Sequence, residues 1–241
     1  MKIRIFPSMN EMSDFIAEEI IRGISAKEKD EDFTLSLSGG NTPKAIFQYI
    51  STHFADKTEW NKVKIFWGDE RCVPPEDPES NFGMARKFLL DHLPIPQQNI
   101  FRICGECEPE QAAERYEKTI RDQVAFNGTG PVFDLFLLGL GPEGHTASIF
   151  PDRLSLFESE KWFDVARHPQ TGQVRITATG KVINNARDIF FLVSGDEKKE
   201  IVKKIVKKEP GWKNLPASHV QALHGSVYWL TDEAAAQNIS I

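Results

Sequence analysis

Short apolar runs that end at glycine are the strongest pattern along this chain. They occupy residues 33–37, 63–67, 132–138 and 189–193, and a glycine follows each run directly or after one serine. Runs of this length suit buried strands and are too short for core helices. The N-terminal run 2–6 alternates charged and apolar residues, which predicts a first strand beginning at about Lys2.

Helical patterns lie between the predicted strands. In the first of them Met12, Ile16, Ile20 and Ile24 fall on one face of an amphipathic helix. Further helices are expected from Pro43 to about His53, from a cap at Ser80 to about His92, from Pro109 to about Phe126, and from Glu197 to Lys207. Strands that alternate with helices predict an α/β fold of three layers, in which a doubly wound, mostly parallel sheet carries helices on both faces. No repeat or linker divides the sequence, so we expect a single domain over residues 1–241.

Composition narrows the class of protein. With 40% hydrophobic and 27% charged residues the chain resembles an ordinary globular protein. Its net charge of −6 disfavours nucleic acid and anionic membranes as partners. No segment approaches the roughly 20 apolar residues of a membrane span. We therefore expect a cytoplasmic protein, either a monomer or a weak homo-oligomer.

The three cysteines suggest a reducing compartment, because their number is odd and no signal peptide precedes them. Cys104 and Cys107 have CxxC spacing. A zinc site would need a second ligand pair nearby, and none is present in the sequence. A plain loop is therefore expected here in preference to a metal or redox site, and no metal or cofactor is predicted.

Ligands of such sheets bind beyond the carboxyl ends of the strands, and the polar residues of interest gather there. The first loop of this kind begins Ser38-Gly39-Gly40 and continues through Thr42 to Pro43. Paired glycines let backbone N–H groups approach an anion, and the helix that follows adds the positive end of its dipole. The spacing fits neither a Walker loop nor a dinucleotide fingerprint. Phosphate binding and an ordinary tight turn both remain open for this segment.

A second strand end carries Asp69, Glu70 and Arg71, with Asn81 shortly after. Charges at such a position are costly to bury unless they are paired or functional. The planar fork of Arg71 suits a phosphate or carboxylate. A local ion pair that fixes the loop is the structural alternative, and Asn81 could equally cap a helix or bridge backbone groups.

The third strand end, residues 139–151, is rich in glycine and contains His145. A free histidine has a pKa near 6.5, so a histidine placed where substrate should bind is a plausible general base. Glu143 is close enough in sequence to orient its ring. Arg175 and Lys198 also follow or lie on predicted strands and could reach an anion, although each alone could be a surface charge.

Together these segments resemble the 6-phosphogluconolactonase family. The matching stretches are SGGNTP at 38–43, GDERCVP at 68–74 with Ser80-Asn81, LGLGPEGHTASIFP at 138–151, Arg175-Ile176-Thr177, Asn184-Asn185-Ala186 and Pro216-Ala217-Ser218. They occur in the order typical of the family and extend over nearly the whole chain. Many members carry aspartate where this chain has Glu143, so the partnership of that residue with His145 needs separate support.

The resemblance implies a fold shared with glucosamine-6-phosphate deaminase and hydrolysis of 6-phospho-D-glucono-1,5-lactone in the oxidative pentose phosphate pathway. It implies that His145 is the general base, without a cofactor, and that the partner is a small-molecule phosphosugar lactone. The residues it assigns to the phosphate are Ser38, Gly39, Gly40, Arg71, Arg175 and Lys198. We expect the reaction's oxyanion to be stabilised by N–H groups of the glycine turn or by a nearby cation.

Two other functions compete with this interpretation. A glucosamine-6-phosphate deaminase/isomerase would use the same phosphate loop, with Asp69 as the base. That family is typically different at two places, where this chain has Arg71 and the segment 146–148. A non-catalytic sugar-phosphate sensor usually carries an N-terminal helix-turn-helix, for which a first strand at Lys2 leaves no room.

Overall fold

Six parallel strands form the main sheet, in the order β1-β9-β8-β5-β2-β3. The computed structural model describes residues 1–239. The strands are β1 (Lys2–Phe6), β2 (Phe33–Leu37), β3 (Val63–Trp67), β5 (Leu135–Gly139), β8 (Asp188–Val193) and β9 (Ser226–Asp232). The mostly parallel α/β architecture predicted from the sequence is confirmed, and β2 and β3 have the predicted bounds.

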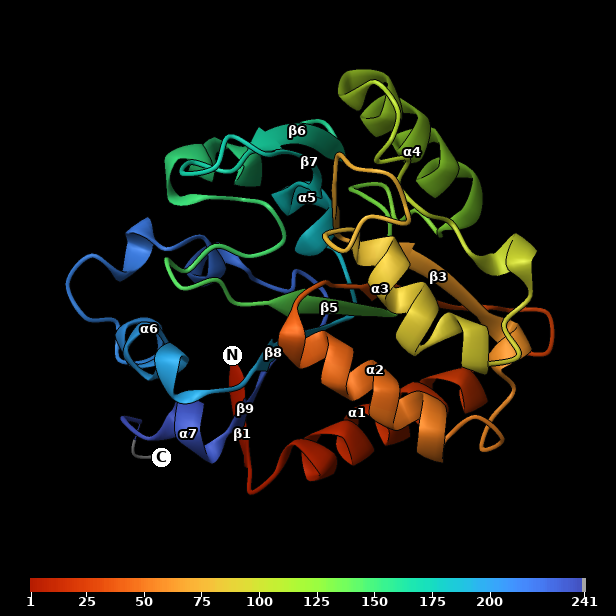
Figure 1. The fold of residues 1–241 in the computed structure, drawn as a ribbon, viewed down its shortest axis with the longest axis horizontal. Helices are drawn as coiled ribbons and strands as arrows, with labels where there is room; N and C mark the ends of the chain where they lie inside the picture. Colours follow the sequence, from red (N-terminus) through yellow and green to blue (C-terminus); the bar gives the residue numbers. More distant parts are fainter. Residues whose placement is uncertain (240–241) are drawn as a thin grey trace.

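Helices cover both faces of this sheet. They are α1 (Met9–Ser25), α2 (Asn41–His53), α3 (Asn81–Phe88), α4 (Pro109–Gln123), α5 (Gly180–Ile183), α6 (Lys199–Val206) and α7 (Glu233–Ala236). Figure 1 shows α1 and α2 on one side of β5, and α5 on the other. Ser80 caps α3 as predicted, since its hydroxyl accepts a hydrogen bond from the N–H of Gly83.

A small antiparallel sheet was not predicted, although a short strand was expected at Arg175-Ile176-Thr177 and is part of β7 (Val174–Ala178). The strands of the small sheet are β4 (Asp69–Arg71), β6 (Phe163–Arg167) and β7, in the order β4-β7-β6. Helix α4 packs on β6 and β7, which lie on the same side of β5 as α5 in Figure 1. Since only Gly68 separates β3 from β4, the chain leaves the main sheet there and carries Asp69 and Arg71 onto the small one.

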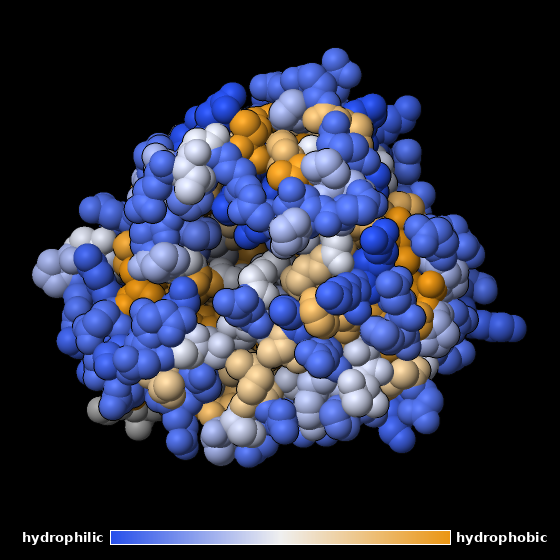
Figure 2. Space-filling model, in the orientation of Figure 1, coloured by the Kyte–Doolittle hydropathy of each residue, from blue (hydrophilic) through white to orange (hydrophobic). Residues whose placement is uncertain are grey.

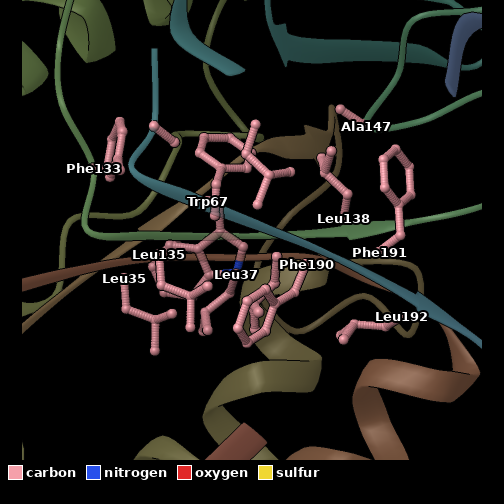
Figure 3. Close-up of a cluster of buried hydrophobic side chains, with 14 of the residues drawn as sticks. Leu35, Leu37, Trp67, Phe133, Leu135, Leu138, Ala147, Phe190, Phe191 and Leu192 are labelled. Carbon is pink, nitrogen blue, oxygen red and sulfur yellow. The ribbon is translucent and has the colours of Figure 1, made fainter. Parts of the chain in front are cut away.

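The core fills both faces of the main sheet because its central strands are apolar without alternation. Figure 3 shows Leu135, Phe190 and Leu192 on one side of the sheet, and Leu138 and Phe191 on the other. All five side chains are buried. The outer surface seen in Figure 2 is mainly hydrophilic, with small separate hydrophobic areas.

Some predicted elements have different bounds. The strand expected at 132–138 begins only at Leu135. Before it, the carboxylate of Asp134 accepts hydrogen bonds from the backbone and hydroxyl of Thr34 and pairs with Lys27. The backbone N–H of Asp134 also donates to the Thr34 carbonyl, so its side chain adds to the backbone bonding with β2. The helix expected to reach about His92 ends at Phe88 and is followed by a single 3₁₀ turn, and the one expected from Glu197 begins as a 3₁₀ turn before α6.

The cysteines differ in part from the expectation. Cys104 and Cys107 lie in a loop as predicted, but they form a disulfide, whereas reduced thiols were expected. Cys72 is free, and burial raises the pKa of its thiol to about 11, so it is not a thiolate at neutral pH.

In the described part of the chain no helix is long and apolar enough to cross a membrane. Within residues 1–239 no cluster of three or more His, Cys, Asp or Glu side chains is placed to hold a metal ion.

Candidate active site

A pocket of about 200 Å³ lies at the carboxyl ends of four neighbouring strands, β8, β5, β2 and β3. The chain leaves β2 toward β3 on one side and β5 toward β8 on the other, so the pocket lies at the point where the strand order reverses. The predicted substrate-binding residues that line it are Ser38, Gly39, Gly40, Thr42, Asp69, Arg71, Asn81, Arg175 and Lys198. His145 lines it as well, and Glu143 lies behind His145. The fold therefore brings all the predicted site residues together.

The glycine loop after β2 requires glycine at two successive positions, for different reasons. A Cβ on Gly39 would collide with the amide oxygen of Asn81, and Gly40 has φ +105°, a conformation that favours glycine. Helix α2 begins directly after this loop, and no side chain caps its first turn. Its N–H groups and dipole therefore face the pocket in the way that favours an anion. The hydroxyl of Thr42 is already paired with that of Ser194, 2.7 Å away at the end of β8.

Arg71 and Arg175 lie directly opposite each other on β4 and β7. Like charges in this register destabilise a sheet. Neither guanidinium forms an ion pair with a carboxylate among residues 1–239, and the buried Nε of Arg71 has no hydrogen-bond partner there. Burial and the charge of Arg71 lower the pKa of Arg175. Two adjacent cations without a carboxylate partner make this part of the pocket suited to an anion.

Asp69 is held in place from two sides. Its carboxylate accepts a hydrogen bond of 2.7 Å from Ser148, which is fully buried. The side-chain amide of Asn81 donates to the backbone carbonyl of Asp69 at 2.9 Å. Asn81 therefore takes the bridging role that the sequence left open. Ser148 was not predicted as a site residue, although it lies inside the histidine-containing segment.

Glu70 binds the backbone at the same strand end. Its buried carboxylate accepts hydrogen bonds from the backbone N–H groups of Arg71, Asn81 and Phe82 and from the Ser80 hydroxyl. Burial raises its pKa to about 6 despite these bonds. Glu70 thus ties the start of α3 to β4, which places Asn81 and Arg71 at the pocket.

The raised pKa of Glu70 predicts a pH-dependent stability. A carboxyl whose folded-state pKa is raised contributes most at low pH, and the contribution is lost as the pH rises through about 6. Relative to Glu70→Gln, the wild type should therefore lose about 2 kcal/mol of unfolding free energy between about pH 3.5 and pH 7.5. Urea unfolding of both proteins across this range measures the difference. A difference that stays constant with pH would show that Glu70 is not strained by burial.

His145 lies in the turn after β5, and its ring packs against two residues. A Cβ on Gly141 would collide with this ring, and the Phe150 ring centroid lies 4.9 Å from that of His145. Ala147 in the same turn has φ +47°, which is strained for a residue with a side chain and is common at functional sites. Gly141 and Phe150 therefore pack closely against the imidazole ring of His145 and fix its direction.

The Nδ1 atom of His145 lies 2.9 Å from Oε1 of Glu143, a contact that becomes an ion pair when the imidazole is protonated. The ring N–H is not aligned well enough with the carboxylate for a regular hydrogen bond. The interaction with His145 lowers the pKa of Glu143 to about 2, against the opposing effect of burial. Glu143 is therefore ionised at neutral pH beside Nδ1. The other ring nitrogen, Nε2, makes no hydrogen bond within the described residues.

The glycine turn offers fewer free donors than the sequence suggested. The N–H of Gly141 donates to the carbonyl of His145, and the N–H of Gly144 donates to the carbonyl of Gly141. These two N–H groups are thus used inside the turn. Of the two expected sources of oxyanion stabilisation, the geometry favours a nearby cation.

Lys198 reaches the pocket from the loop after β8. Asp232, at the end of β9, accepts a hydrogen bond from the N–H of Gly195 and also caps α7. Gly195 has φ +98°, so the loop turns sharply at this point. The end of β9 therefore fixes the segment that carries Glu197 and Lys198, both of which line the pocket.

Comparison with known proteins gives a consistent set of matches. The sequence pattern of the family described as glucosamine-6-phosphate isomerases/6-phosphogluconolactonase matches residues 7–229. The 6-phosphogluconolactonase of Haemophilus influenzae is 39% identical over 96% of this chain and 97% of its own length. That of Homo sapiens is 35% identical over 99% of this chain and 94% of its own length.

Solved structures agree with these matches. The crystal structure of a devB protein has a TM-score of 0.92 at 36% identity and covers 99% of each chain. The 6-phosphogluconolactonase of Trypanosoma brucei has a TM-score of 0.87 at 28% identity, covering 99% of this chain and 98% of its own. A monomeric glucosamine-6-phosphate deaminase has a TM-score of 0.82 at 24% identity, covering 99% of this chain and 100% of its own, which shows the shared fold.

Proposed function

Because this chain belongs to the family of glucosamine-6-phosphate isomerases and 6-phosphogluconolactonases, we propose that it hydrolyses 6-phospho-D-glucono-1,5-lactone to 6-phospho-D-gluconate. One observation carries the proposal. His145, with Glu143 beside its Nδ1, lines the same pocket as two arginines that have no carboxylate partner within residues 1–239. A base and an anion site in one pocket suit a lactone that carries a phosphate.

The reaction follows from the placement of these groups. Arg71 and Arg175 hold the phosphate together with the N–H groups of the glycine loop and Lys198, which fixes the sugar ring in the pocket. Nε2 of His145 takes a proton from water as the water oxygen attacks the lactone carbonyl carbon. The tetrahedral intermediate collapses with cleavage of the bond to the ring oxygen. The imidazolium returns the proton to that oxygen, so the products are a carboxylic acid, which ionises, and a free hydroxyl.

Glu143 assists by its charge and position. A carboxylate beside Nδ1 favours the imidazolium that forms when Nε2 takes up a proton. Asp69, fixed by Ser148, provides acceptor oxygens for the hydroxyl groups of the sugar. The oxyanion is stabilised by Lys198, whose three N–H donors can serve it as well as a phosphate oxygen, because the N–H groups of Gly141 and Gly144 are bonded inside the turn.

The proposal extends to the domain organisation, location and partners of the enzyme. It acts as one domain over residues 1–241, in the cytoplasm, as a monomer or weak homo-oligomer and without a nucleic acid partner. Its net charge of −6 supports the last point. The deaminase/isomerase remains the second candidate on fold, but the arginine pair, of which Arg71 stands where that family typically has tyrosine, favours the lactonase.

Comparison of two lactones tests the phosphate part of the proposal. Hydrolysis of 6-phosphogluconolactone should exceed that of unphosphorylated glucono-1,5-lactone by roughly 10³-fold in kcat/KM, since several charge-assisted hydrogen bonds are lost without the phosphate. Both rates are measured as acid release above the spontaneous rate in buffer. Equal values would mean that the pocket does not recognise phosphate.

The role of Glu143 leads to a separate prediction. Glu143→Gln should reduce kcat by about 10-fold to 100-fold with little change in KM, because the imidazolium loses its charged partner. Glu143→Asp should retain most of the activity. Glu158→Gln is a suitable control, since Glu158 is exposed and makes no ion pair in the described part of the chain. Full activity of Glu143→Gln would remove this residue from the mechanism.

A further inference from the structure

One side-chain bridge contacts both arginines of the pocket. Gln173 immediately precedes β7, and Glu79 lies in the loop between β4 and α3. The side-chain amide of Gln173 donates to the Glu79 carboxylate at 2.8 Å. Its oxygen accepts from Nε of Arg175 at 3.0 Å. On the other side, Nη1 of Arg71 donates to the backbone carbonyl of Glu79 at 2.7 Å.

This bridge fixes the direction of both guanidinium groups. In Arg175 the Nε edge is occupied by Gln173, which leaves Nη1 and Nη2 for a ligand, with Ser148 at 3.5 Å from Nη1. In Arg71 one Nη1 donor is occupied by Glu79, and the buried Nε is left without a partner among residues 1–239. Planar forks bind phosphate well when their direction is set in advance, because less freedom is lost on binding.

The chemistry of glutamine matters at this position. An amide oxygen accepts the hydrogen bond of Arg175 without cancelling its positive charge. A carboxylate in the same place would pair with the guanidinium and compete with a bound phosphate. Glu79 provides the carboxylate, but Gln173 stands between it and Nε of Arg175. The arrangement holds Arg175 firmly and leaves its charge available.

We propose that Gln173, held by Glu79, is a positioning residue that aligns Arg175 and Arg71 on the substrate's phosphate. The inference rests on the proposed function. The inference goes beyond the proposed function because Gln173 lies outside every segment that carries the family resemblance. Gln173 acts through the two arginines and does not touch the reacting carbonyl. Loss of the bridge should weaken binding of the phosphosugar and leave the chemical step nearly unchanged.

Two variants and one control test this role. Gln173→Ala removes the bridge, while Gln173→Glu keeps the length of the side chain but places a carboxylate on Arg175. Gln170→Ala is the matched control, because Gln170 lies in the same hairpin and its side chain makes no hydrogen bond within residues 1–239. Calorimetry with the stable product 6-phosphogluconate gives Kd, and lactone hydrolysis gives KM and kcat.

We expect Kd and KM to rise about fivefold in Gln173→Ala and at least as much in Gln173→Glu, with kcat within twofold of the wild type. The control should match the wild type. If the wild type binds 6-phosphogluconate and both Gln173 variants have the same Kd, this inference is overturned while the proposed function stands. A loss confined to kcat would overturn this inference in the same way. Failure of the wild type itself to bind 6-phosphogluconate would instead overturn the proposed function, and this inference with it.

Discussion

Replacing His145 with asparagine should reduce kcat for lactone hydrolysis by about 10³-fold, with KM changed much less. General-base assistance by a placed side chain contributes roughly 10² to 10⁴ in rate. His145 is the histidine that lines the pocket, and its Nε2 makes no hydrogen bond within residues 1–239. The amide of asparagine does not take up the proton. Initial rates, corrected for spontaneous opening of the lactone, measure the loss.

The control for this variant is a second histidine on the same aromatic ring. His168 packs against Phe150 at a centroid distance of 5.1 Å, and its Nδ1 accepts hydrogen bonds from the N–H groups of Gln170 and Thr171. In His168→Asn the side-chain oxygen replaces this acceptor. The control should retain activity. Near-full activity of His145→Asn would contradict a base role for His145.

Replacing Arg175 with alanine should raise KM by about 100-fold and leave kcat within a few fold. A guanidinium that donates two hydrogen bonds to a phosphate is worth about 3 kcal/mol, which corresponds to this change in affinity. Unphosphorylated glucono-1,5-lactone should show almost no difference between the wild type and the variant. Steady-state kinetics with both lactones measure the two effects.

Arg167→Ala provides the matched control, because Arg167 lies in the same small sheet, opposite Val174, and is exposed. It should behave as the wild type with both lactones. If Arg175→Ala lost activity equally on the phosphorylated and unphosphorylated lactone, Arg175 would act on the carbonyl or on the fold, and the phosphate role would be wrong.

Most of the main sheet was predictable because β2, β3, β5 and β8 are short, mainly apolar runs that end at or just before a glycine, whereas β9 was not predicted. Residues 33–37 and 63–67 therefore have the observed bounds. The small sheet was harder, since β4 consists of the three polar residues Asp69–Arg71, which resemble a loop in composition. Its strand character comes from pairing with β7, about 100 residues away along the chain, and local sequence does not encode that partner.

The site was predicted as a set of residues but not as a geometry. Strand ends of a parallel sheet meet at one edge, which explains why Ser38, Asp69 and His145 come together. The direct opposition of Arg71 and Arg175 depends on the register of β4 and β7. Ser148 gains its role from the bond to Asp69, and Gln173 from the bond to Glu79; both partners are distant in sequence, so no local signal identified these residues.

The interpretation of Glu143 became more definite through the structure. A glutamate in place of the common aspartate raised doubt about its reach, and the structure places its carboxylate 2.9 Å from Nδ1 of His145. The extra methylene does not prevent the contact. Glu143→Gln tests the contribution of this contact to catalysis.

The most direct test of the account compares two substrates with the wild-type enzyme. Consumption of freshly prepared 6-phosphoglucono-1,5-lactone is followed against buffer alone, and glucosamine 6-phosphate is incubated in parallel with ammonia as the readout. We predict lactone consumption far above the spontaneous rate and no release of ammonia. Ammonia release together with a lactone rate equal to that of buffer would contradict the account and identify the pocket as that of a deaminase.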